Sequence, residues 1–338
     1  MNRVWILTRS FPPHADISAR RYAGLVPHLE ALEWEPWILT LQQDSGLYGK
    51  VPGSLPLPLE ESRILRLDQS KLSARPLAVK VFRKLLFKMR AYLRSIGFHA
   101  WVLSYLDDDF ERCLDTSVLN LCRTRGLPKP DIILCSVGPG GSMVLGRNLA
   151  RRLKVPYIAG LRDLRGLIDG RQTLLELFDR LVEGYLVSEA SGFLATSPTS
   201  ARLLERSYKK RAIAVFNGLT DSLKPSVSRE ASETPYPFYA GRLYEHQMAA
   251  VNLLISSVSA YNSTSEVKIK IRLRTIGPPD LEQQLDRKIA EYKAQAFAER
   301  LEGCPPEQVV TEANHAVANI VVEDLGKTEP FRRGTIPG

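Results

Sequence analysis

The sequence has few cysteines, and none of them stands at the spacing of metal ligands. Cys113, Cys122, Cys135 and Cys304 form no C-x-x-C pair, and no histidine lies at ligand spacing from them. This pattern argues against a structural zinc site and favours a reducing compartment. We therefore expect a cytoplasmic protein that holds no metal ion and no other cofactor.

Long apolar runs are also missing. No stretch approaches the roughly 18 consecutive apolar residues that a membrane-spanning helix needs. The run at residues 1–8 is too short for the apolar region of a secretory leader, and Arg9 interrupts it. We expect a soluble protein or one that binds a membrane surface peripherally.

Charge and composition limit the class of protein but do not identify its function. Apolar residues make up 44% and charged residues 25% of the 338 residues, as in ordinary globular proteins, and the length suits two domains. The 46 Lys and Arg residues exceed the 37 Asp and Glu residues, which gives a net charge of +9. Such a surplus favours acidic partners, whether phosphates, nucleotides, anionic lipid or nucleic acid, without choosing among them.

The first two thirds of the chain alternate short apolar runs with amphipathic segments. Runs without polar alternation, such as residues 4–8, are typical of strands buried on both faces of a parallel sheet. The pattern predicts an α/β fold with a doubly wound parallel sheet, whose ligands bind at the carboxyl ends of the strands. Further strands are expected over 37–41, 131–136, 156–160, 192–196 and 213–216, and helices over 18–32, 142–153, 171–188 and after Ser197.

The first helix and the segment after the second strand are predicted in more detail. Ser18 is the expected cap of the first helix, and Leu32 is expected on the apolar stripe of that helix with Tyr22 and Val26. Residues 44–70, rich in Pro, Gly and Ser, are expected to be irregular.

The pattern restarts after residues 222–235, whose composition is typical of a linker. We divide the chain into an N-terminal domain over 1–221 with an irregular basic insertion at 44–130, the linker, and a partial C-terminal domain over 236–338. The last domain has too few expected elements to cover both faces of a second doubly wound sheet, so we expect it to be incomplete at Gly338. Its expected strands are 237–240, 268–276 and 319–322, and its expected helices are 246–261 and 280–301.

Residues 75–98 carry the most one-sided charge. On a helical wheel the cations share one side and the apolar residues the other, and no acidic residue occurs between Lys71 and Leu106. A solvated face over a packed stripe is the plain explanation, and a helix that lies on anionic lipid is the alternative. Nucleic acid is the least favoured partner, because no recognised motif accompanies the cations. The membrane-facing residues would be Lys80, Arg83, Lys84, Phe87, Lys88 and Arg90.

Several loops with polar or charged residues each follow an expected strand. They are Phe11-Pro12-Pro13 with Arg20-Arg21, Leu161-Arg162-Asp163, Asn217-Gly218 and Gly241-Arg242-Leu243. In this order, together with Thr196-Ser197 and the last six residues, they resemble glycosyltransferase family 4 over about residues 1–43 and 131–338. The resemblance implies the GT-B fold, which has two Rossmann-like doubly wound domains, the second of them incomplete here.

The resemblance implies a donor site in the second domain, made of Gly241, Arg242, His246 and Gly277. A leaving diphosphate needs cations and backbone N–H groups, and Arg242 follows a glycine that lets the backbone approach. The alternative for Arg242 is an ordinary surface arginine at a strand end. Where the family usually has a lysine, this sequence has His246-Gln247-Met248.

The resemblance places the acceptor against the first domain. Asp163, at a strand end beside Arg162, is the candidate catalytic residue, although an Arg-Asp pair is as often a structural ion pair. Asp16 is more often a helix N-terminal residue that the dipole favours. The acceptor-side residues would be Pro13, His14, Asp16, Arg21 and Arg162, and Asn217 and Gly218 would lie between the domains.

The implied activity is transfer of a sugar from a nucleotide-diphosphate sugar to a glycan or lipid-linked acceptor. It would be retaining and metal-independent, and would serve polysaccharide biosynthesis in the cytoplasm or at the inner face of the membrane. Because the family's second domain continues past the loop at Gly338, we expect this chain to bind donor poorly. Two alternatives stay open: a truncated or degenerate non-catalytic GT-B protein, and a nucleotide-sugar epimerase-type GT-B enzyme.

Overall fold

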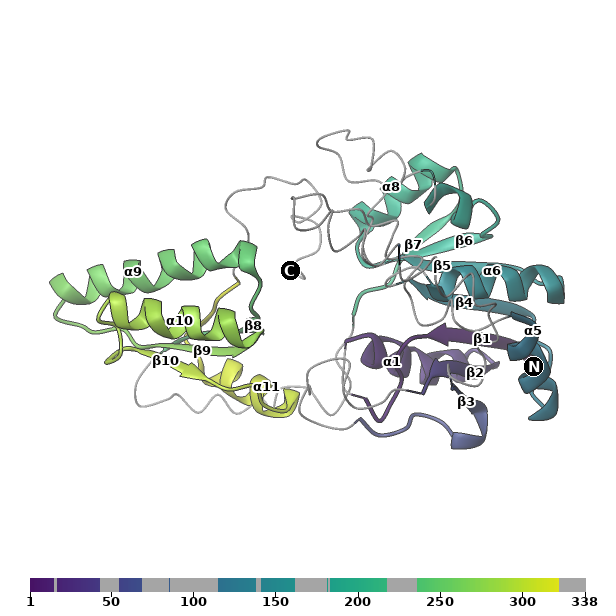
Figure 1. Cartoon of the computed structure of the whole chain (residues 1–338), viewed down its shortest axis with the longest axis horizontal. Helices are drawn as coiled ribbons and strands as arrows, with labels where there is room; N and C mark the ends of the chain where they lie inside the picture. The colour runs from purple at the N-terminus through teal and green to yellow at the C-terminus, as the bar shows by residue number, and fades with distance from the viewer. Residues whose placement is uncertain are drawn as a thin grey trace. The chain divides into compact units, whose positions relative to one another are not determined.

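The structure, a computed structural model, falls into two compact units, one before and one after residues 218–235 (Figure 1). It describes residues 1–14, 17–42, 55–68, 85, 115–137, 141–161, 181, 183–217 and 236–321. Several predictions lie outside these residues, including the linker, most of the basic segment over 75–98 and all of its membrane-facing residues. Asp16, Arg162, Asp163 and Gly218 lie outside them as well.

The first unit is built on a parallel sheet of seven strands in the order β3-β2-β1-β4-β5-β6-β7. The order reverses between β1 and β4, so the predicted doubly wound α/β fold is confirmed for this unit. β1 pairs with β2 along its full length, from Asn2 opposite Trp34 to Thr8 opposite Thr40. The strands are β1 Asn2–Thr8, β2 Trp34–Leu41, β3 Ile64–Leu67, β4 Ile132–Val137, β5 Tyr157–Leu161, β6 Gly192–Ala195 and β7 Ala212–Ala214.

Helices cover both faces of this sheet, because successive strand residues point to opposite faces. Val4 and Ile6 of β1 pack with Tyr22 and Val26 of α1, Ile17–Ala31. The opposite face carries Trp5 and Leu7 together with buried residues of α5 (Asp115–Thr124), α6 (Gly141–Leu153), α8 (Pro198–Tyr208) and the helical residues 183–187.

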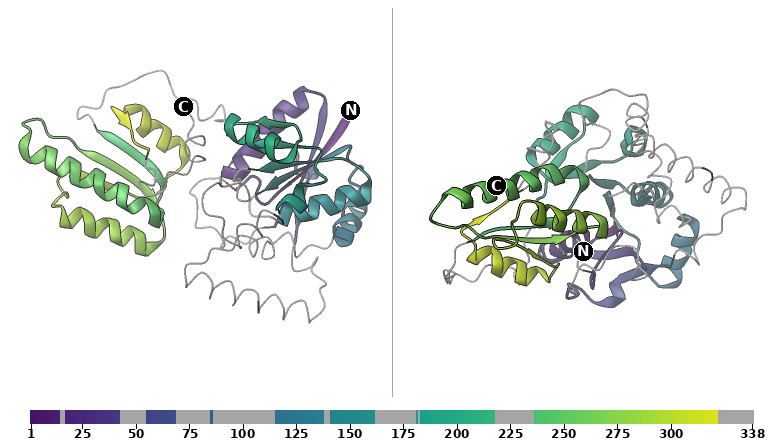
Figure 2. Two further views of the ribbon diagram at one scale, coloured as in Figure 1. Left: turned by 90° about the horizontal axis from the view of Figure 1, so that it is seen from above. Right: turned by 60° about the vertical axis from the view of Figure 1, so that its left-hand side comes forward.

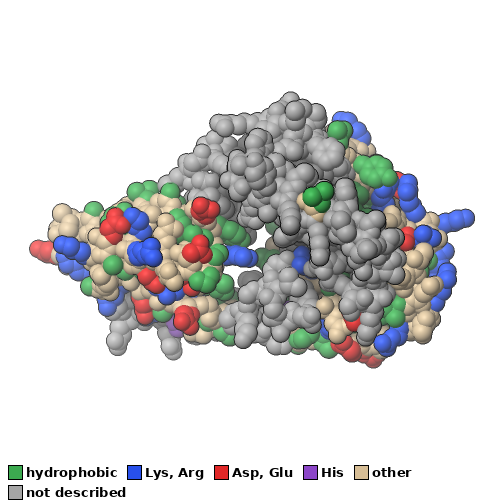
Figure 3. Space-filling model, in the orientation of Figure 1, with side chains coloured by type: hydrophobic (Ala, Val, Ile, Leu, Met, Phe, Trp, Pro, Cys, Tyr) green, Lys and Arg blue, Asp and Glu red, His purple; other side chains and the backbone are tan. Residues whose placement is uncertain are grey.

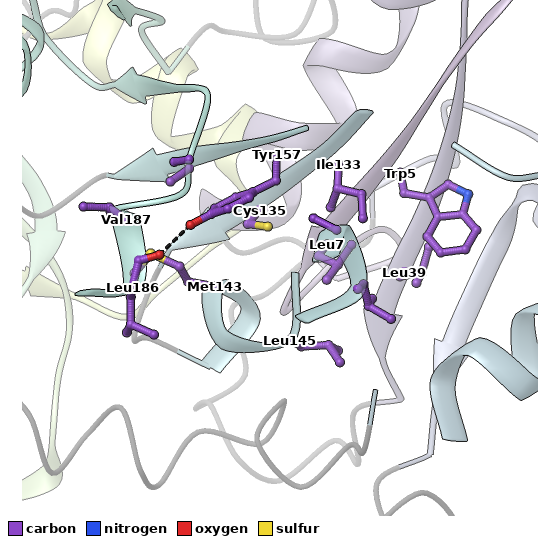
Figure 4. Close-up of a cluster of buried hydrophobic side chains, with 14 of the residues drawn as sticks. Trp5, Leu7, Leu39, Ile133, Cys135, Met143, Leu145, Tyr157, Leu186 and Val187 are labelled. Atoms are coloured by element: carbon purple, nitrogen blue, oxygen red, sulfur yellow. Dashed lines mark hydrogen bonds between the residues drawn. The ribbon is translucent and has the colours of Figure 1, made fainter. Parts of the chain in front are cut away.

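The core of that second face is drawn in Figure 4. Cys135 and Met143 lie with Tyr157, whose hydroxyl donates to the backbone carbonyl of Leu186 at 2.5 Å. The bond satisfies a phenol that is 2% exposed, and it fixes the end of the helical residues 183–187 on the sheet.

Four predictions for the first unit are wrong in detail. Residues 44–70 are not irregular throughout, because 64–67 form edge strand β3, held by its pairing with β2. Ser18 lies inside α1 rather than at its cap, and Leu32 is 70% exposed beyond the helix end. The strand expected over 213–216 is β7, which ends at Ala214. By contrast the helix predicted after Ser197 is confirmed as α8, and the Ser197 hydroxyl caps it by accepting from the N–H of Ser200 at 3.1 Å.

The second unit has four parallel strands in the order β10-β9-β8-β11, which again reverses beside the first strand of the unit. Tyr239 and Leu273 pack under α9 and α10, while Phe238 and Ala316 pack with α11 on the opposite face. Figure 2 shows the sheet between these helices. The elements are β8 Pro237–Arg242, α9 Met248–Thr264, β9 Ile271–Ile276, α10 Pro279–Glu291, β10 Ala298–Leu301, α11 Pro306–His315 and β11 Ala318–Asn319.

Three predictions for this unit are wrong. The strand expected over 319–322 is β11, which ends at Asn319. The helix expected over 280–301 ends at Glu291, because Lys293 adopts a left-handed conformation with φ 51° and the chain then pairs with β9 as β10. The elements are also not too few to cover both faces, since α11, which the sequence pattern did not reveal, packs on the face opposite α9 and α10. The predicted α/β fold is confirmed here too.

Candidate functional site

The loop after β1 is held at the carboxyl end of the first sheet by hydrogen bonds from neighbouring strands. The hydroxyl of Thr40 donates to the carbonyl of Arg9 at 3.1 Å, and that of Thr8 donates to the carbonyl of Ser10 at 3.1 Å. The guanidinium of Arg66, on β3, donates to the carbonyl of Pro12 at 2.8 Å. Since β3 supplies this last bond, the strand that the sequence pattern missed also fixes the expected acceptor loop.

Two predicted acceptor-side residues sit on this loop. Pro13 is exposed and its carbonyl accepts from the N–H of Leu55 at 3.0 Å, while His14 is half-buried. Beneath them the side chain of Phe11 is fully buried in the core with Tyr22. The loop therefore presents a fixed backbone with one exposed and one half-buried side chain.

Arg21, the third of these residues, points into the protein instead. It is 8% exposed, and its guanidinium donates to the side-chain oxygen of Asn217 at 2.9 Å. A second donor lies 3.5 Å from the carbonyl of Ala195, at the end of β6. The structure thus joins a residue predicted for the acceptor with a residue predicted to lie between the domains.

The neighbouring strand β5 leads to the candidate residues Arg162 and Asp163, which lie outside the described part of the chain. Its Gly160 is tightly enclosed, because a Cβ there would lie 2.9 Å from the Tyr22 hydroxyl and 3.2 Å from the carbonyl of Cys135. Tyr22 is 1% exposed and was expected only as a core residue. It is the side chain that brings α1 against this end of β5.

In the second unit, the structure brings three predicted donor residues to one edge. Gly241 and Arg242 end β8 opposite Thr275 and Ile276 of β9, and Gly277 follows directly. The N–H of Leu243 donates to the carbonyl of Ile276 at 2.9 Å, which ties the two strand ends together. Arg242 is exposed, so its positive charge stands free of the core at this edge.

Both glycines at this edge lie in close contacts. A Cβ on Gly241 would lie 2.7 Å from the hydroxyl of Tyr239, and one on Gly277 would lie 3.0 Å from the Cβ of Leu243. The N–H of Gly277 donates to the Glu282 carboxylate at 3.0 Å. Only a residue without a side chain fits at these two positions without displacing a neighbour, so the ends of β8 and β9 pack closely against Tyr239 and Leu243.

Tyr239 and Tyr244 frame Arg242. The guanidinium carbon lies 5.6 Å from the centroid of the Tyr244 ring, within cation–π range, and the Tyr239 hydroxyl donates to the Arg242 carbonyl at 3.4 Å. Burial raises the pKa of Tyr239, so its hydroxyl stays protonated near neutral pH. Neither tyrosine was expected at the site, although each stands within three positions of Arg242. His246 lies in the 3₁₀ turn Glu245–Gln247 that follows.

The described residues show neither a metal-binding cluster nor a membrane-spanning helix. No group of three or more His, Cys, Asp or Glu side chains there is arranged to hold a metal ion. In the same residues, no helix combines the length and apolar character that a bilayer crossing requires.

Comparison with known families and structures gives one sequence match and many structural ones. Residues 18–217 match the model of a family described as glycosyl transferase 4-like domain. No curated protein matches the chain in sequence. A solved structure described as trehalose-6-phosphate from E. coli bound with UDP-2-fluoro glucose is similar at a TM-score of 0.60 and 12% identity, over 95% of this chain and 78% of that one.

Two further solved structures have similar folds. Sucrose-phosphate synthase from Thermosynechococcus elongatus is similar at a TM-score of 0.56 and 14% identity, over 95% of this chain and 75% of that one. Anabaena HepE in complex with UDP and glucose gives a TM-score of 0.55 and 10% identity, over 94% and 73%. These likenesses identify the fold of this chain as GT-B, as the sequence resemblance implied.

Proposed function

Since this chain belongs to the glycosyl transferase 4-like family, matched over residues 18–217, we propose that it transfers a sugar from a nucleotide-diphosphate sugar to a glycan or lipid-linked acceptor. We further propose that transfer is retaining and needs no metal ion. The reaction would serve polysaccharide biosynthesis in the cytoplasm, at the inner face of the membrane.

One observation carries the donor half of this proposal, namely the position of Gly241 and Arg242 at the carboxyl end of β8. Ligands of doubly wound sheets bind outside the carboxyl ends of strands, near the point where strand order reverses, and β8 is the strand beside that point. The exposed guanidinium of Arg242 supplies the positive charge and the hydrogen-bond donors that a leaving diphosphate needs.

Similar structures support the choice of donor class. The E. coli structure is described as bound with UDP-2-fluoro glucose, and HepE as a complex with UDP and glucose. Both ligands contain a nucleoside diphosphate, which is the part that Arg242 would bind in this chain. His246 and Gly277 would complete the donor side.

The acceptor half rests on the first unit. Pro13 and His14 stand on a loop whose backbone is fixed by β2 and β3, so they would meet the acceptor in a constant position. We assign Asp163 as the catalytic carboxylate, with Arg162 and Asp16 beside the acceptor, and Asn217 and Gly218 as the connection between domains. Arg21 is buried and bonded to Asn217, so it would act on the acceptor side by positioning Asn217.

Titration calorimetry of the 338-residue chain with UDP-, GDP- and ADP-glucose tests the donor assignment. Arg242→Ala should lower the affinity for the bound nucleotide sugar about tenfold or more, because a charge-assisted hydrogen bond contributes about 1.5–3 kcal/mol. Arg287→Ala, at an exposed arginine on α10, is the matched control and should leave the affinity unchanged. If wild type, Arg242→Ala and Arg287→Ala all bind the nucleotide sugar with equal affinity, Arg242 does not belong to the donor site.

Product analysis separates transfer from the two alternatives. Release of nucleoside diphosphate that requires an added acceptor, with the anomeric configuration of the donor kept in the product, is the expected result. Conversion of one nucleotide sugar to its epimer would assign the chain to epimerase chemistry. Donor binding without turnover on any acceptor tried would leave a non-catalytic binding protein.

A further inference from the structure

The amino-terminal edge of the first sheet is opposite the edge that carries the acceptor loop. The loops that precede β4, β5, β6 and β7 all lie at this edge, because the strands are parallel. These four strands are neighbours in the sheet, and at about 4.8 Å between strands the four loops span about 15 Å. Residues far apart in the sequence thereby form one continuous surface.

The part of this edge formed by the loops before β4, β5, β6 and β7 is strongly positive. Residues 123–131, 151–156, 188–191 and 205–211 contain ten Lys or Arg against three acidic residues, a surplus of seven, where the whole chain has a surplus of nine. Lys and Arg side chains gather along the right-hand margin of Figure 3, where Figure 1 places α5 and the end of α6.

The three acidic groups in these four loops are already engaged within the protein. Asp131 accepts the N–H of Arg3 at 2.7 Å, Glu189 pairs with Arg147 and Arg151 at 2.5 Å each, and Glu205 accepts the N–H of Ala212 at 3.1 Å. Most of the cations, by contrast, form no ion pair or side-chain hydrogen bond with any other described residue. These seven cations, named here the edge cations, are Arg123, Arg125, Lys129, Lys154, Arg206, Lys209 and Arg211.

Helix dipoles explain only part of this surplus. Arg123 and Arg206 lie in the last turns of α5 and α8, where a cation is favoured by the partial negative charge of the helix end. Arg125, Lys129 and Arg211 lie beyond the helices, in the loops that lead into the strands. Their charges face solvent and find no counter-charge in the described protein, so they are available to a partner.

Two large apolar side chains are exposed beside the edge cations. Ile213, two positions after Arg211 on edge strand β7, is 47% exposed. Tyr185, in the last turn before the loop that leads into β6, is 61% exposed, and its ring lies 4.1 Å from the guanidinium of Arg147. Cations that surround aliphatic and aromatic side chains are typical of surfaces that lie in the headgroup region of a bilayer.

We propose that this amino-terminal edge docks the first unit onto a membrane surface rich in anionic phospholipid. The inference deepens the membrane association in the proposed function and rests on it for its biological role. Phosphate groups of the lipid would bind the edge cations, and Ile213 and Tyr185 would enter the headgroup layer. A nucleic acid fits this surface less well, since it would gain nothing from an exposed isoleucine.

The orientation has a consequence for the acceptor. β4 has six residues, and at about 3.3 Å per residue its carboxyl end stands about 20 Å from the docked edge. The loop with Pro13 and His14 would therefore be held away from the lipid surface, in reach of outer sugars of a lipid-linked glycan. The lipid phosphate of such a glycan would lie at the docked edge, on the opposite side of the sheet from this loop.

Vesicle flotation of the full chain tests the docking surface. Wild type should float with vesicles that contain anionic phosphatidylglycerol and stay unbound with pure phosphatidylcholine. The triple variant Arg125→Gln, Lys129→Gln, Arg211→Gln should lose at least tenfold in vesicle affinity, because each cation contributes about fivefold near an anionic surface. Equal binding of wild type to both kinds of vesicle would overturn the proposal.

A matched control changes three exposed cations of the second unit, Lys270→Gln, Arg287→Gln and Lys293→Gln, with the same loss of charge. This variant should keep the wild-type affinity, and an equal loss would show a response to total charge alone and overturn the proposal. A variant with Lys84→Gln and Lys88→Gln tests the other basic segment. If that change alone abolishes binding, the edge is not the docking surface.

The variant Ile213→Ser tests whether the partner of this edge is a lipid surface or a polyanion such as DNA. It should lower vesicle binding at high salt, where charge is screened, and leave binding to a DNA duplex unchanged. DNA binding that the edge variant abolishes, without any binding to vesicles, would reassign the edge to a polyanion and overturn the lipid proposal. Sugar transfer to a soluble acceptor should persist in the edge variant, so failure of docking and failure of the proposed reaction are distinguishable.

Discussion

The guanidinium of Arg21 donates to the side-chain oxygen of Asn217 at 2.9 Å, although 196 positions separate the two residues. Arg21 belongs to α1, which follows the acceptor loop, and Asn217 is the last described residue after β7. Because Arg21 is only 8% exposed, this bond holds the exit of the chain from the first unit against α1.

A double-mutant cycle measures this connection. Arg21→Ala should lower the free energy of unfolding by about 1–3 kcal/mol, because it removes a charge-assisted hydrogen bond made by a buried side chain. Asn217→Ala should cost less, and the two changes together should show a coupling energy of about 1 kcal/mol or more in urea unfolding. Arg202→Ala, at an exposed arginine of α8, is the control and should cost under about 0.5 kcal/mol. If the losses of unfolding free energy in the two single variants simply add in the double variant, the contact between Arg21 and Asn217 would be contradicted.

Gly146 of α6 is packed against Cys135 of β4. A Cβ at position 146 would lie 2.0 Å from the sulfur of Cys135, which is fully buried (Figure 4). Gly146→Ala should therefore destabilise the protein by about 1–3 kcal/mol in urea unfolding, in spite of the higher helix propensity of alanine. Cys135→Ala in the same chain should remove most of that extra cost, because it removes the clashing atom.

Gly24 of α1 provides the matched control, because a Cβ there meets nothing within 4 Å. Gly24→Ala should stabilise the protein by about 0.5–1 kcal/mol, through the smaller entropy of the unfolded chain. A loss of stability at Gly24, or a Gly146→Ala variant as stable as wild type, would contradict the packing described for the two helices.

The strands that could be predicted are those made of a run of apolar residues, because such a run indicates a buried strand. Val4 to Thr8 is an apolar run, and all five residues are buried. β10 could not be predicted in this way, because Ala298–Leu301 includes Glu299 and Arg300 and becomes a strand only through its parallel pairing with β9. The sequence pattern therefore extended α10 over it, although the left-handed Lys293 ends that helix region.

The candidate site shows the same limit. Gly241, Arg242 and Gly277 were found because each follows or ends a recognisable strand, and the pairing of β8 with β9 brings them together. The link between Arg21 and Asn217 was not predicted, although both residues were singled out, because nothing in a single sequence relates positions so far apart. Tyr239 was missed, because the contact of its hydroxyl with Gly241 depends on the folded backbone and is not visible in the sequence pattern.

In the second unit, Arg274 of β9 and Glu312 of α11 form a buried ion pair. The side chains are 9% and 16% exposed, and the Arg274 Nε donates to the carboxylate at 2.7 Å. Glu312→Gln should cost about 3 kcal/mol of unfolding free energy, because it leaves a buried guanidinium without its counter-charge. Differential scanning calorimetry and urea unfolding measure the loss.

Arg272 and Glu299 form the comparison pair, since they join the same strand β9 to β10 but are 38% and 54% exposed. Glu299→Gln should cost under about 1 kcal/mol, because solvent screens an exposed pair. If both substitutions cost the same, burial is not what distinguishes the two pairs, and the role assigned to α11 in holding its face of the sheet would be wrong.

The carboxylate of Glu189 accepts hydrogen bonds from Arg147 and Arg151 at 2.5 Å each. These hydrogen bonds, that of Arg147 first, lower the pKa of Glu189 below its ordinary value. Because the pKa of Glu189 is lower in the folded state, its charged carboxylate stabilises the fold at pH values above the ordinary pKa of a carboxyl group. This stabilisation is lost as the pH falls through the lowered pKa of the folded protein.

The difference in unfolding free energy between wild type and Glu189→Gln should therefore be constant at about pH 6–8 and shrink below about pH 4. Urea unfolding of both proteins at a series of pH values measures it. Glu266→Gln, at an exposed residue that forms no ion pair with any other described residue, is the control and should match wild type throughout. A difference that grows as the pH falls would have the opposite sign, and it would show that the charged form of Glu189 opposes folding beside Arg147.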